Sequence, residues 1–486
     1  MKVTFIALPW IFKNPELQSH EGYSQNLGIG YLASWVEKHG HMVFAIDIFA
    51  EGADTTHEVV LGRKNHYIIG LSPEETVTKI PEDSDIIGIT CSFNSQAFLI
   101  EKYASAIKKC YPDRRVVLGG TYATSFPQEA LTDHIDIVVR GEGEIPLLNL
   151  LSGKPLEDIK GILYRSEGKV MDNALAPLVE NMDDLPFPAR NLLPMEKYFE
   201  RSQRGEEKSA RSISITTTRG CPFRCEFCSL HNLENNYAKQ WRARTPENVM
   251  AEIDSLKEQY GDVSFQFEDD NIMVDRNRAK ELFRQLRGRK VKWSIHSGVM
   301  INLLDEETIK LMKESGCEQL NIALESGNKK VIKAMNKPMN LEKAEEVVRL
   351  CVKYRVNVLA FLIVGYPGET KETFKETLKV LKKLRGFGLK RIAPFIINAH
   401  RGTVLFEKCK EKGYLRNIEE GAYSQSDMVC IETEDFKESD VWEWMDQVVR
   451  IQNPVRWMTK RILKKLLPQS FYSRAILIYR GLHDLI

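Results

Sequence analysis

Three cysteines within eight residues constrain this chain more than any other feature of its sequence. Cys221, Cys225 and Cys228 follow an alternating run that is typical of a strand, and three residues and then two separate them. Thiolates are soft ligands, and cysteines this close together favour zinc or an iron–sulfur cluster. Zinc needs a fourth ligand, for which His231 is the nearby candidate. A cluster bound by three cysteines would instead leave one iron open.

Length and composition indicate a globular chain with two or three domains. The sequence has 486 residues, 43% of them hydrophobic and 28% charged, so it can form large cores. Its net charge of +1 gives no overall attraction to nucleic acid, and we expect no nucleic-acid partner. The other six cysteines are scattered, which suits buried thiols in a reducing, cytoplasmic environment. We expect no signal peptide and no membrane span, because no apolar run approaches ~20 residues.

Residues 1–152 alternate short apolar runs with amphipathic stretches, which predicts a doubly wound α/β domain with a parallel sheet. The predicted strands are Val3–Leu8, Val43–Ile48, Asp85–Cys91, Arg115–Leu118 and Asp136–Val139, and the predicted helices are Leu27–Lys38, Gln96–Lys109 and Ile145–Leu151. Such sheets bind ligands beyond the carboxyl ends of their strands. Two segments that lie there permit either close approach of a ligand or an ordinary tight turn. Their members are Gly119, Gly120 and Thr121, and Gly141, Glu142 and Gly143.

Residues 212–415 repeat a strand–helix pattern six times. The predicted strands are Ser212–Thr218, Asp262–Glu268, Val291–His296, Gln319–Ala323, Asn357–Val364 and Arg391–Ile397. The predicted helices are Pro246–Gln259, Arg276–Leu286, Glu306–Lys313, Leu341–Tyr354 and Lys371–Leu384. Active sites of βα barrels lie at the carboxyl ends of the strands. The candidate residues at three of these ends are Glu268 and Asp269, Glu325 and Ser326, and Gly365 and Pro367.

Two segments flank this second domain. Residues 153–211 are rich in proline and form a predicted linker, because proline cannot continue a helix or a central strand. Residues 416–486 have helical patterns, and Arg456–Ile486 carries seven Lys or Arg against one Asp. A basic amphipathic helix of this kind makes peripheral contact with a membrane, or packs on the preceding domain with its basic face in water. Both interpretations stay open.

The cysteine spacing resembles the signature of the radical S-adenosylmethionine (SAM) superfamily. The first domain resembles the cobalamin (B12)-binding domain found ahead of many radical SAM cores, on the segments Leu27–Ala33, Gly119–Thr124 and Arg140–Glu144. Together the two resemblances imply an α/β chain with a Rossmann-like, doubly wound cobalamin-binding domain. A partial (βα)6 radical SAM barrel, open on one side, and a helical C-terminal region would follow it.

The resemblance also implies the cofactors and their contacts. Cys221, Cys225 and Cys228 would hold a [4Fe–4S] cluster whose open iron binds the amino and carboxylate groups of SAM. No catalytic side chain is assigned. The residues implied to contact SAM are Glu268, Asp269, Glu325, Ser326, Gly365 and Pro367, and those implied to contact cobalamin are Gly119, Gly120, Thr121, Gly141, Glu142 and Gly143.

Some positions depart from the family's patterns. The loop after the first strand holds His20 without the Asp-x-His-x-x-Gly spacing, and Tyr122 stands where relatives commonly have histidine. We therefore expect no imidazole ligand to cobalt. The third strand of the barrel lacks the arginine that often meets the SAM carboxylate, and His296 could supply a donor there or face the substrate. His400 and Arg401 follow the sixth strand and could meet a polar or anionic substrate group.

Three functions stay open on this evidence. The first is cobalamin-dependent radical SAM methylation of an unactivated carbon in a small-molecule or lipid substrate. The second keeps the radical chemistry for cyclisation, oxidation or carbon–carbon coupling. Both would need an electron donor such as flavodoxin or ferredoxin. The third is a non-catalytic corrinoid- or zinc-binding module, against which the strand-end acids Glu268 and Glu325 argue, because a zinc site needs neither.

Overall fold

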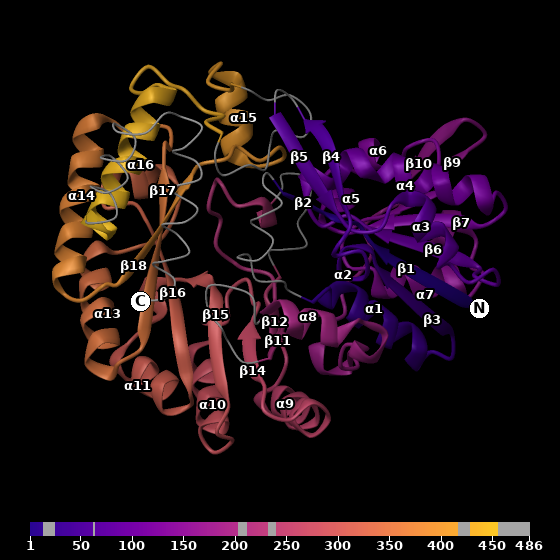
Figure 1. The fold of residues 1–486 in the computed structure, drawn as a ribbon, viewed down its shortest axis with the longest axis horizontal. Helices are drawn as coiled ribbons and strands as arrows, with labels where there is room; N and C mark the ends of the chain where they lie inside the picture. The colour runs from indigo at the N-terminus through magenta and orange to yellow at the C-terminus, as the bar shows by residue number, and fades with distance from the viewer. Residues whose placement is uncertain (13–24, 62–63, 203–210, 232–239, 417–427, 455–486) are drawn as a thin grey trace.

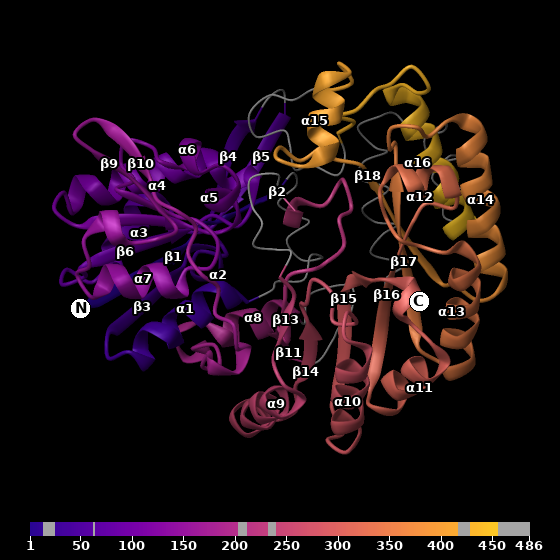
Figure 2. The ribbon, with the colours of Figure 1, turned by 180° about the vertical axis from the view of Figure 1, so that it is seen from behind.

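Two α/β domains lie side by side in the structure, which is a computed structural model (Figure 1). It describes residues 1–12, 25–61, 64–202, 211–231, 240–416 and 428–454. The N-terminal domain occupies the indigo and purple half of the ribbon, and the second domain occupies the pink to orange half. The view from behind shows the same division, with the segment that carries β12 (Thr218–Arg219) and β13 (Arg242–Ala243) near the boundary (Figure 2).

The first domain is built on a sheet of order β10-β9-β8-β7-β6-β1-β3 in the described residues. Its strands are β1 (Lys2–Ala7), β3 (Met42–Asp47), β6 (Ile86–Thr90), β7 (Arg115–Gly119), β8 (Ile137–Val139), β9 (Ile162–Ser166) and β10 (Lys169–Asp172). The first five are parallel to one another, and their order along the sheet is second, first, third, fourth, fifth. This is the doubly wound order of flavodoxin-like sheets, so the predicted fold class is confirmed. The apolar runs are explained by helices on both faces of the sheet.

Helices and a small second sheet complete this domain. The helices are α1 (Leu27–Lys38), α2 (Ile48–Glu51), α3 (Pro73–Thr78), α4 (Ala97–Cys110), α5 (Thr121–Ser125), α6 (Pro127–Ala130) and α7 (Glu144–Leu151). Helix α1 begins where the Asn26 side chain accepts a hydrogen bond from the Ile29 amide, at 3.1 Å. The second sheet is antiparallel and was not predicted from the sequence. It contains β2 (Trp10–Phe12), β4 (Thr56–Leu61) and β5 (Lys64–Ile69).

The antiparallel hairpin β9–β10 lies within residues 153–211, the segment predicted as a linker. It continues the first sheet, and α8 (Met195–Ser202) follows near the end of the same segment. Between them the chain carries Arg190, which is almost fully buried. Its guanidinium lies 2.6 Å from Glu252 Oε1 and donates to the Ser214 carbonyl at 2.7 Å. This connecting segment is therefore attached to the second domain by buried polar contacts.

The second domain is a curved parallel sheet of order β11-β14-β15-β16-β17-β18 among the described residues. Its strands are β11 (Ser212–Ile215), β14 (Ser264–Phe267), β15 (Lys292–Val299), β16 (Cys317–Glu325), β17 (Asn357–Val364) and β18 (Arg391–Ile396). Every neighbouring pair is parallel. No pairing between the two edge strands, β11 and β18, occurs in the described chain, so the predicted six-stranded partial barrel is confirmed.

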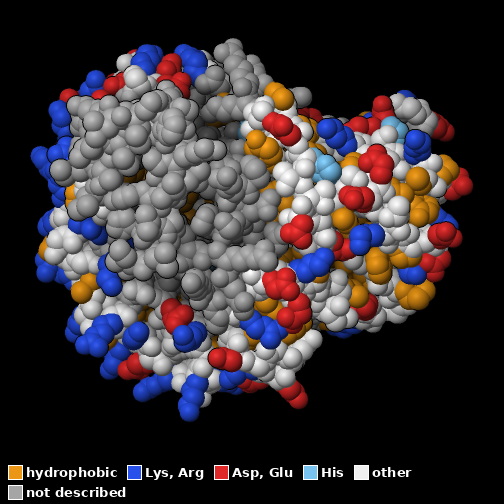
Figure 3. Space-filling model, viewed as in Figure 1, with side chains coloured by type: hydrophobic (Ala, Val, Ile, Leu, Met, Phe, Trp, Pro, Cys, Tyr) orange, Lys and Arg blue, Asp and Glu red, His pale blue; other side chains and the backbone are white. Residues whose placement is uncertain are grey.

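Amphipathic helices cover the outside of this barrel. They are α9 (Pro246–Tyr260), α10 (Arg276–Arg287), α11 (Glu306–Glu314), α12 (Lys329–Ala334), α13 (Leu341–Tyr354) and α14 (Lys371–Gly386). Helix α13 shows how the sequence determines where a helix begins and ends. Asn340 caps its amino end, Val347 and Val348 are among the residues it buries, and Arg355 ends it in a left-handed conformation with φ +56°. The water-facing sides carry many of the Lys and Arg side chains seen around the barrel margin in Figure 3.

Helix α15 (Val404–Glu411) lies at the end of the barrel domain, and the described part of the C-terminal region contains α16 (Glu438–Gln452). Helix α16 packs on the barrel, because Trp444 stacks on Phe374 of α14 with ring centroids 4.8 Å apart. The segment Arg456–Ile486, for which membrane contact was one interpretation, lies outside the described residues. Within the part of the chain that the structure describes, no helix has the length and apolar character needed to cross a bilayer.

A buried polar network joins the two domains. Arg244, in the barrel, binds Glu252 and donates to the Tyr31 hydroxyl at 3.3 Å. Tyr31 belongs to α1 of the first domain, and its hydroxyl donates to the Thr216 carbonyl at 3.3 Å. Both guanidinium groups on Glu252, from Arg190 and Arg244, are nearly inaccessible to solvent. The network therefore reaches the first domain through the hydrogen bonds of the Tyr31 hydroxyl.

Candidate active site

The three cysteines lie on one loop directly after β12, close to the boundary between the domains. All three are partly buried, and burial raises the pKa of the Cys228 thiol to about 11. Burial also raises the pKa of Cys225, against the opposing effect of the nearby Lys337 ammonium. A bound iron would favour the thiolate form of these side chains. The amide nitrogen of Asn271 lies 3.9 Å from Cys221 Sγ, a contact that the sequence did not suggest.

No three metal-ligating side chains among the described residues are placed to share a single metal ion. In a [4Fe–4S] cluster each cysteine binds a different iron, so the thiols need not meet at one point. His231, the candidate fourth zinc ligand, has a side chain outside the described part of the structure.

Asp269, at the end of β14, anchors the backbone that leads into the cysteine loop. Its Oδ1 accepts hydrogen bonds from the Thr217 amide at 2.9 Å, the Thr217 hydroxyl at 2.9 Å and the Thr218 hydroxyl at 2.6 Å. The side chain is fully buried, and burial raises its pKa above the ordinary value. Asp270 accepts from the Gly220 amide at 3.0 Å. Glu268 is only partly buried, and it accepts a hydrogen bond from the Ser214 hydroxyl at 3.2 Å.

Glu325 ends β16 in an unusual backbone conformation and forms a buried ion pair. Its φ is +57°, in the left-handed region that non-glycine residues rarely adopt. Its Oε1 lies 2.6 Å from Lys337 Nζ, and both side chains are less than a tenth exposed. Lys337 Nζ also lies 5.8 Å from the ring centre of Phe227, within the cysteine loop. Ser326 is fully buried, with its hydroxyl 3.4 Å from that of Thr377. The structure thus links Glu325 to the cysteine loop through Lys337.

The segment after β17 turns through Gly365, whose φ is +85°. The Gly365 amide donates to Glu369 Oε2 at 2.8 Å, which closes the turn around Pro367. Glu369 is fully buried, and burial raises its pKa to about 8. Tyr366 in the same turn stacks edge-on against Phe227, with ring centroids 6.5 Å apart. The segment that carries Gly365 and Pro367, two of the implied SAM contacts, therefore packs against the cysteine loop.

The predicted cobalamin segments surround a cavity of about 290 Å³ at the carboxyl edge of the first sheet. Its glycines are Gly28, Gly88, Gly119, Gly120, Gly141 and Gly143. Gly120 has φ +99°, and a Cβ there would lie 2.5 Å from the Cys91 carbonyl oxygen. Thr121 begins α5 and is exposed. The barrel residues Thr216 and Arg219 complete the lining.

Glu142, predicted to contact cobalamin, also forms ion pairs with the barrel. It binds Arg242, and Arg219 Nη1 lies 3.4 Å from its Oε1. Burial would raise the pKa of Glu142, but the two guanidinium groups hold it below the ordinary value. Arg219 also lies 2.8 Å from Oε1 of Glu144, whose side chain is only 4% exposed. This cluster was not predicted from the sequence, because its arginines and glutamates belong to different domains and no local pattern pairs them.

The remaining candidate residues are Arg401 and the histidines, whose contacts could not be predicted from the sequence. Arg401, a candidate contact for a polar or anionic substrate group, pairs bidentately with Glu129 of the first domain. His400, beside it, is partly buried, and burial lowers its pKa. His296 lies partly buried on β15, where its carbonyl accepts from Asn321 at 2.9 Å. His20 lies outside the described residues.

Tyr122, which stands where relatives often have histidine, is buried, and its hydroxyl lies 3.5 Å from Glu129 Oε2. Burial raises its pKa to about 12, so it is a neutral phenol over the ordinary pH range.

The donor sets fit the implied cofactors. Three partly buried thiols on one loop match a cluster that leaves one iron open. The buried pair of Glu325 and Lys337 places a carboxylate and an ammonium near this loop. The cavity leaves open backbone at Gly119, where an added Cβ would meet no atom within 4 Å, so a ligand can approach the main chain closely there.

Comparisons with known proteins match both halves of the chain. The profile of the Radical SAM superfamily matches residues 215–381, and that of the B12 binding domain matches residues 17–151. The chain is 30% identical over 430 residues to cytidylyl-2-hydroxyethylphosphonate methyltransferase of Streptomyces wedmorensis, covering 82% of this chain and 80% of that protein. It is 32% identical over 368 residues to an uncharacterized methyltransferase of Pyrococcus horikoshii, covering 74% and 73%.

Among solved structures, the cobalamin-dependent SAM radical enzyme OxsB with aqua-cobalamin bound shares the fold, with a TM-score of 0.71 at 16% identity. The match covers 99% of this chain and 71% of that one. The comparisons therefore favour an enzyme over the non-catalytic module.

Proposed function

This chain belongs to the radical SAM superfamily, in the branch with an N-terminal B12-binding domain, and we propose that it methylates an unactivated carbon of a small molecule. One observation carries the proposal. The glycine-lined cavity of the first domain is completed by Thr216 and Arg219, and Arg219 lies only two residues before Cys221. The two cofactor sites are thus joined by a few residues of continuous chain at the domain boundary.

When bound, the [4Fe–4S] cluster, SAM and cobalamin supply a carbon-centred radical and a transferable methyl group. The chain's own residues hold and separate these groups. In our proposal Cys221, Cys225 and Cys228 bind the cluster, and Gly119, Gly120 and Gly141–Gly143, which line the cavity, contact the corrinoid together with the adjacent Thr121. The ion pairs of Arg219 with Glu142 and Glu144 hold the proposed cluster site and the proposed corrinoid site next to each other.

On the barrel side, Glu268 is the better placed of the two predicted acids to meet the SAM amino group. Asp269 is buried and accepts three hydrogen bonds from Thr217 and Thr218. Glu268 is only partly buried. Glu325, Ser326, Gly365 and Pro367 remain the proposed contacts for the rest of SAM. Lys337 Nζ lies 2.6 Å from Glu325 Oε1, so this ammonium compensates the charge of the buried carboxylate.

Methyl-labelled SAM tests the reaction type. We expect the product of the reconstituted enzyme to retain the labelled methyl group in mass spectrometry, and the matched Cys225→Ala variant to give no such product. Turnover that forms 5′-deoxyadenosine and a product without the label would contradict methylation and favour cyclisation, oxidation or coupling.

We also propose that Arg456–Ile486 brings the enzyme to anionic membranes. Its sequence supports this with seven cations, each contributing roughly 1 kcal/mol near such a surface. Flotation with anionic liposomes would compare the full chain with one that stops at Asn453. Equal failure of both to float would contradict membrane contact and leave the methylation proposal intact.

A further inference from the structure

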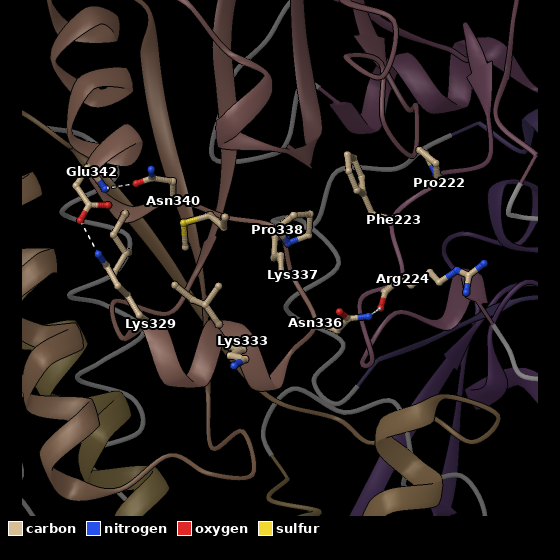
Figure 4. Close-up of a pocket in the computed structure, with 13 residues that line it drawn as sticks. Pro222, Phe223, Arg224, Lys329, Lys333, Asn336, Lys337, Pro338, Asn340 and Glu342 are labelled. Carbon is tan, nitrogen blue, oxygen red and sulfur yellow. Dashed lines mark hydrogen bonds and ion pairs between the residues drawn. The ribbon is translucent and has the colours of Figure 1, made fainter.

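A basic groove of about 630 Å³ opens beside the cysteine loop (Figure 4). One side is formed by Pro222, Phe223 and Arg224, which lie between the first two cysteines. The other side is formed by α12 and the segment that follows it, residues 335–342. The loop is fixed to this segment, because Asn336 Nδ2 donates to the Arg224 carbonyl at 2.8 Å. The groove therefore ends at backbone that belongs to the cluster site.

Positive charge dominates the rim of this groove. Arg224, Lys329 and Lys333 are exposed, and Glu342 is the acid among the lining residues. Lys329 Nζ lies 2.6 Å from that acid, with both side chains largely exposed. Neither Arg224 nor Lys333 has an ion-pair partner among the residues that the structure describes. Such unpaired, exposed cations attract an acidic surface through water and speed its association.

The floor of the groove is apolar and leads toward the cluster site. Phe223, Pro338, Met339 and Leu341 contribute apolar surface between the charged side chains. Beneath them lies Lys337, which pairs with Glu325 and faces the ring of Phe227. An apolar centre within a charged rim is the arrangement of small protein interfaces, including weak electron-transfer contacts.

We propose that this groove is the docking surface for a small acidic electron-transfer flavoprotein of the flavodoxin class. The proposal rests on the proposed function, since radical SAM chemistry needs one electron per cleavage event. The reduced flavin of the partner loses one electron, and the oxidised [4Fe–4S] cluster gains it. No bond is formed or broken with this chain in that step. A flavin presents an apolar ring edge, which suits the apolar floor, and an acidic surround suits Arg224, Lys329 and Lys333.

Charge reversal on α12 tests the proposal with the reconstituted full-length enzyme. We expect the double variant Lys329→Glu/Lys333→Glu to bind an acidic flavodoxin at least about tenfold more weakly in calorimetry at low salt, because two attractions become repulsions. The matched control is Lys390→Glu, an exposed lysine just before β18, at the opposite end of the barrel strands. It should bind flavodoxin as the wild-type enzyme does.

A second readout separates docking from chemistry. Dithionite, a small reductant that needs no protein docking, should drive 5′-deoxyadenosine formation in the double variant within twofold of wild type. With limiting reduced flavodoxin the same variant should be at least about tenfold slower, and rising salt should narrow that gap.

Unchanged flavodoxin affinity in the double variant would overturn the docking assignment, as would an equal loss in Lys390→Glu. Selective binding of a ferredoxin in this groove, with flavodoxin unaffected by the substitutions, would also overturn it. Failure of wild-type enzyme with dithionite would instead contradict the proposed radical function, and the binding measurement would still report on the groove.

Discussion

Replacing Arg219 by leucine should loosen the contact between the two cofactor sites. Arg219 lies 2.8 Å from Glu144 and 3.4 Å from Glu142. Glu142 would keep its pair with Arg242, but Glu144 would be left as a buried, uncompensated carboxylate. Breaking a buried ion pair costs about 3–5 kcal/mol, and we expect a value of about 3 kcal/mol because Arg219 itself is 19% exposed.

A double-mutant cycle measures this loss. The apparent free energy of unfolding of the apoprotein in urea would be compared for wild type, Arg219→Leu, Glu144→Gln and the double variant. The double variant should be more stable than the sum of the single effects implies, by at least ~1.5 kcal/mol, because it leaves no buried charge unpaired. Single effects below ~0.5 kcal/mol that add in the double variant would refute the claim that this pair joins the domains.

Three further predictions concern buried groups. Glu369→Gln should remove a pH dependence of stability, because burial raises the folded pKa of Glu369 from 4.5 to about 8. The free energy of unfolding of wild type should fall relative to that of the variant as the pH rises between these values, and then level off. A constant difference from pH 5 to 9 in urea titrations would contradict this. Gly120→Ala should lower the free energy of unfolding by about 1–3 kcal/mol and weaken corrinoid binding. The control Gly153→Ala, also at positive φ but in open space, should leave corrinoid binding unchanged. Equal corrinoid retention by both variants would contradict this prediction. Lys337→Met should lower the free energy of unfolding by about 3 kcal/mol, because it leaves Glu325 unpaired. The double variant Lys337→Met/Glu325→Gln should regain part of this stability. Thermal unfolding that shows no regained stability would contradict the pairing.

Local signals in the sequence were sufficient for much of the fold. The bounds of α13 and β17 match the predicted Leu341–Tyr354 and Asn357–Val364, because an asparagine cap, a regular apolar face and a continuous apolar run all agree. The small sheet of β2, β4 and β5 was missed, because its strands are short and gain their partners only in three dimensions. Such pairing leaves a weak trace in a single segment.

The site shows the same division between local and long-range information. The cysteines and the glycine segments were visible in the sequence, since each motif is contiguous. The partners of Glu142 were not, because Arg242 is 100 positions further along the chain. The pairing of Arg401 with Glu129 was not visible for the same reason: it depends on how the two domains meet, and no local pattern encodes that.

Metal and corrinoid analysis of one anaerobic preparation tests the central claim most directly. After reconstitution with iron, sulfide and cobalamin, followed by gel filtration, we expect about four iron atoms and about one cobalt per wild-type chain. The Cys225→Ala variant should lose iron and keep cobalt, whereas Gly120→Ala should lose cobalt and keep iron. Wild-type protein that retains zinc in place of iron, or no corrinoid at all, would contradict an enzyme that holds both cofactors at the boundary of its two domains.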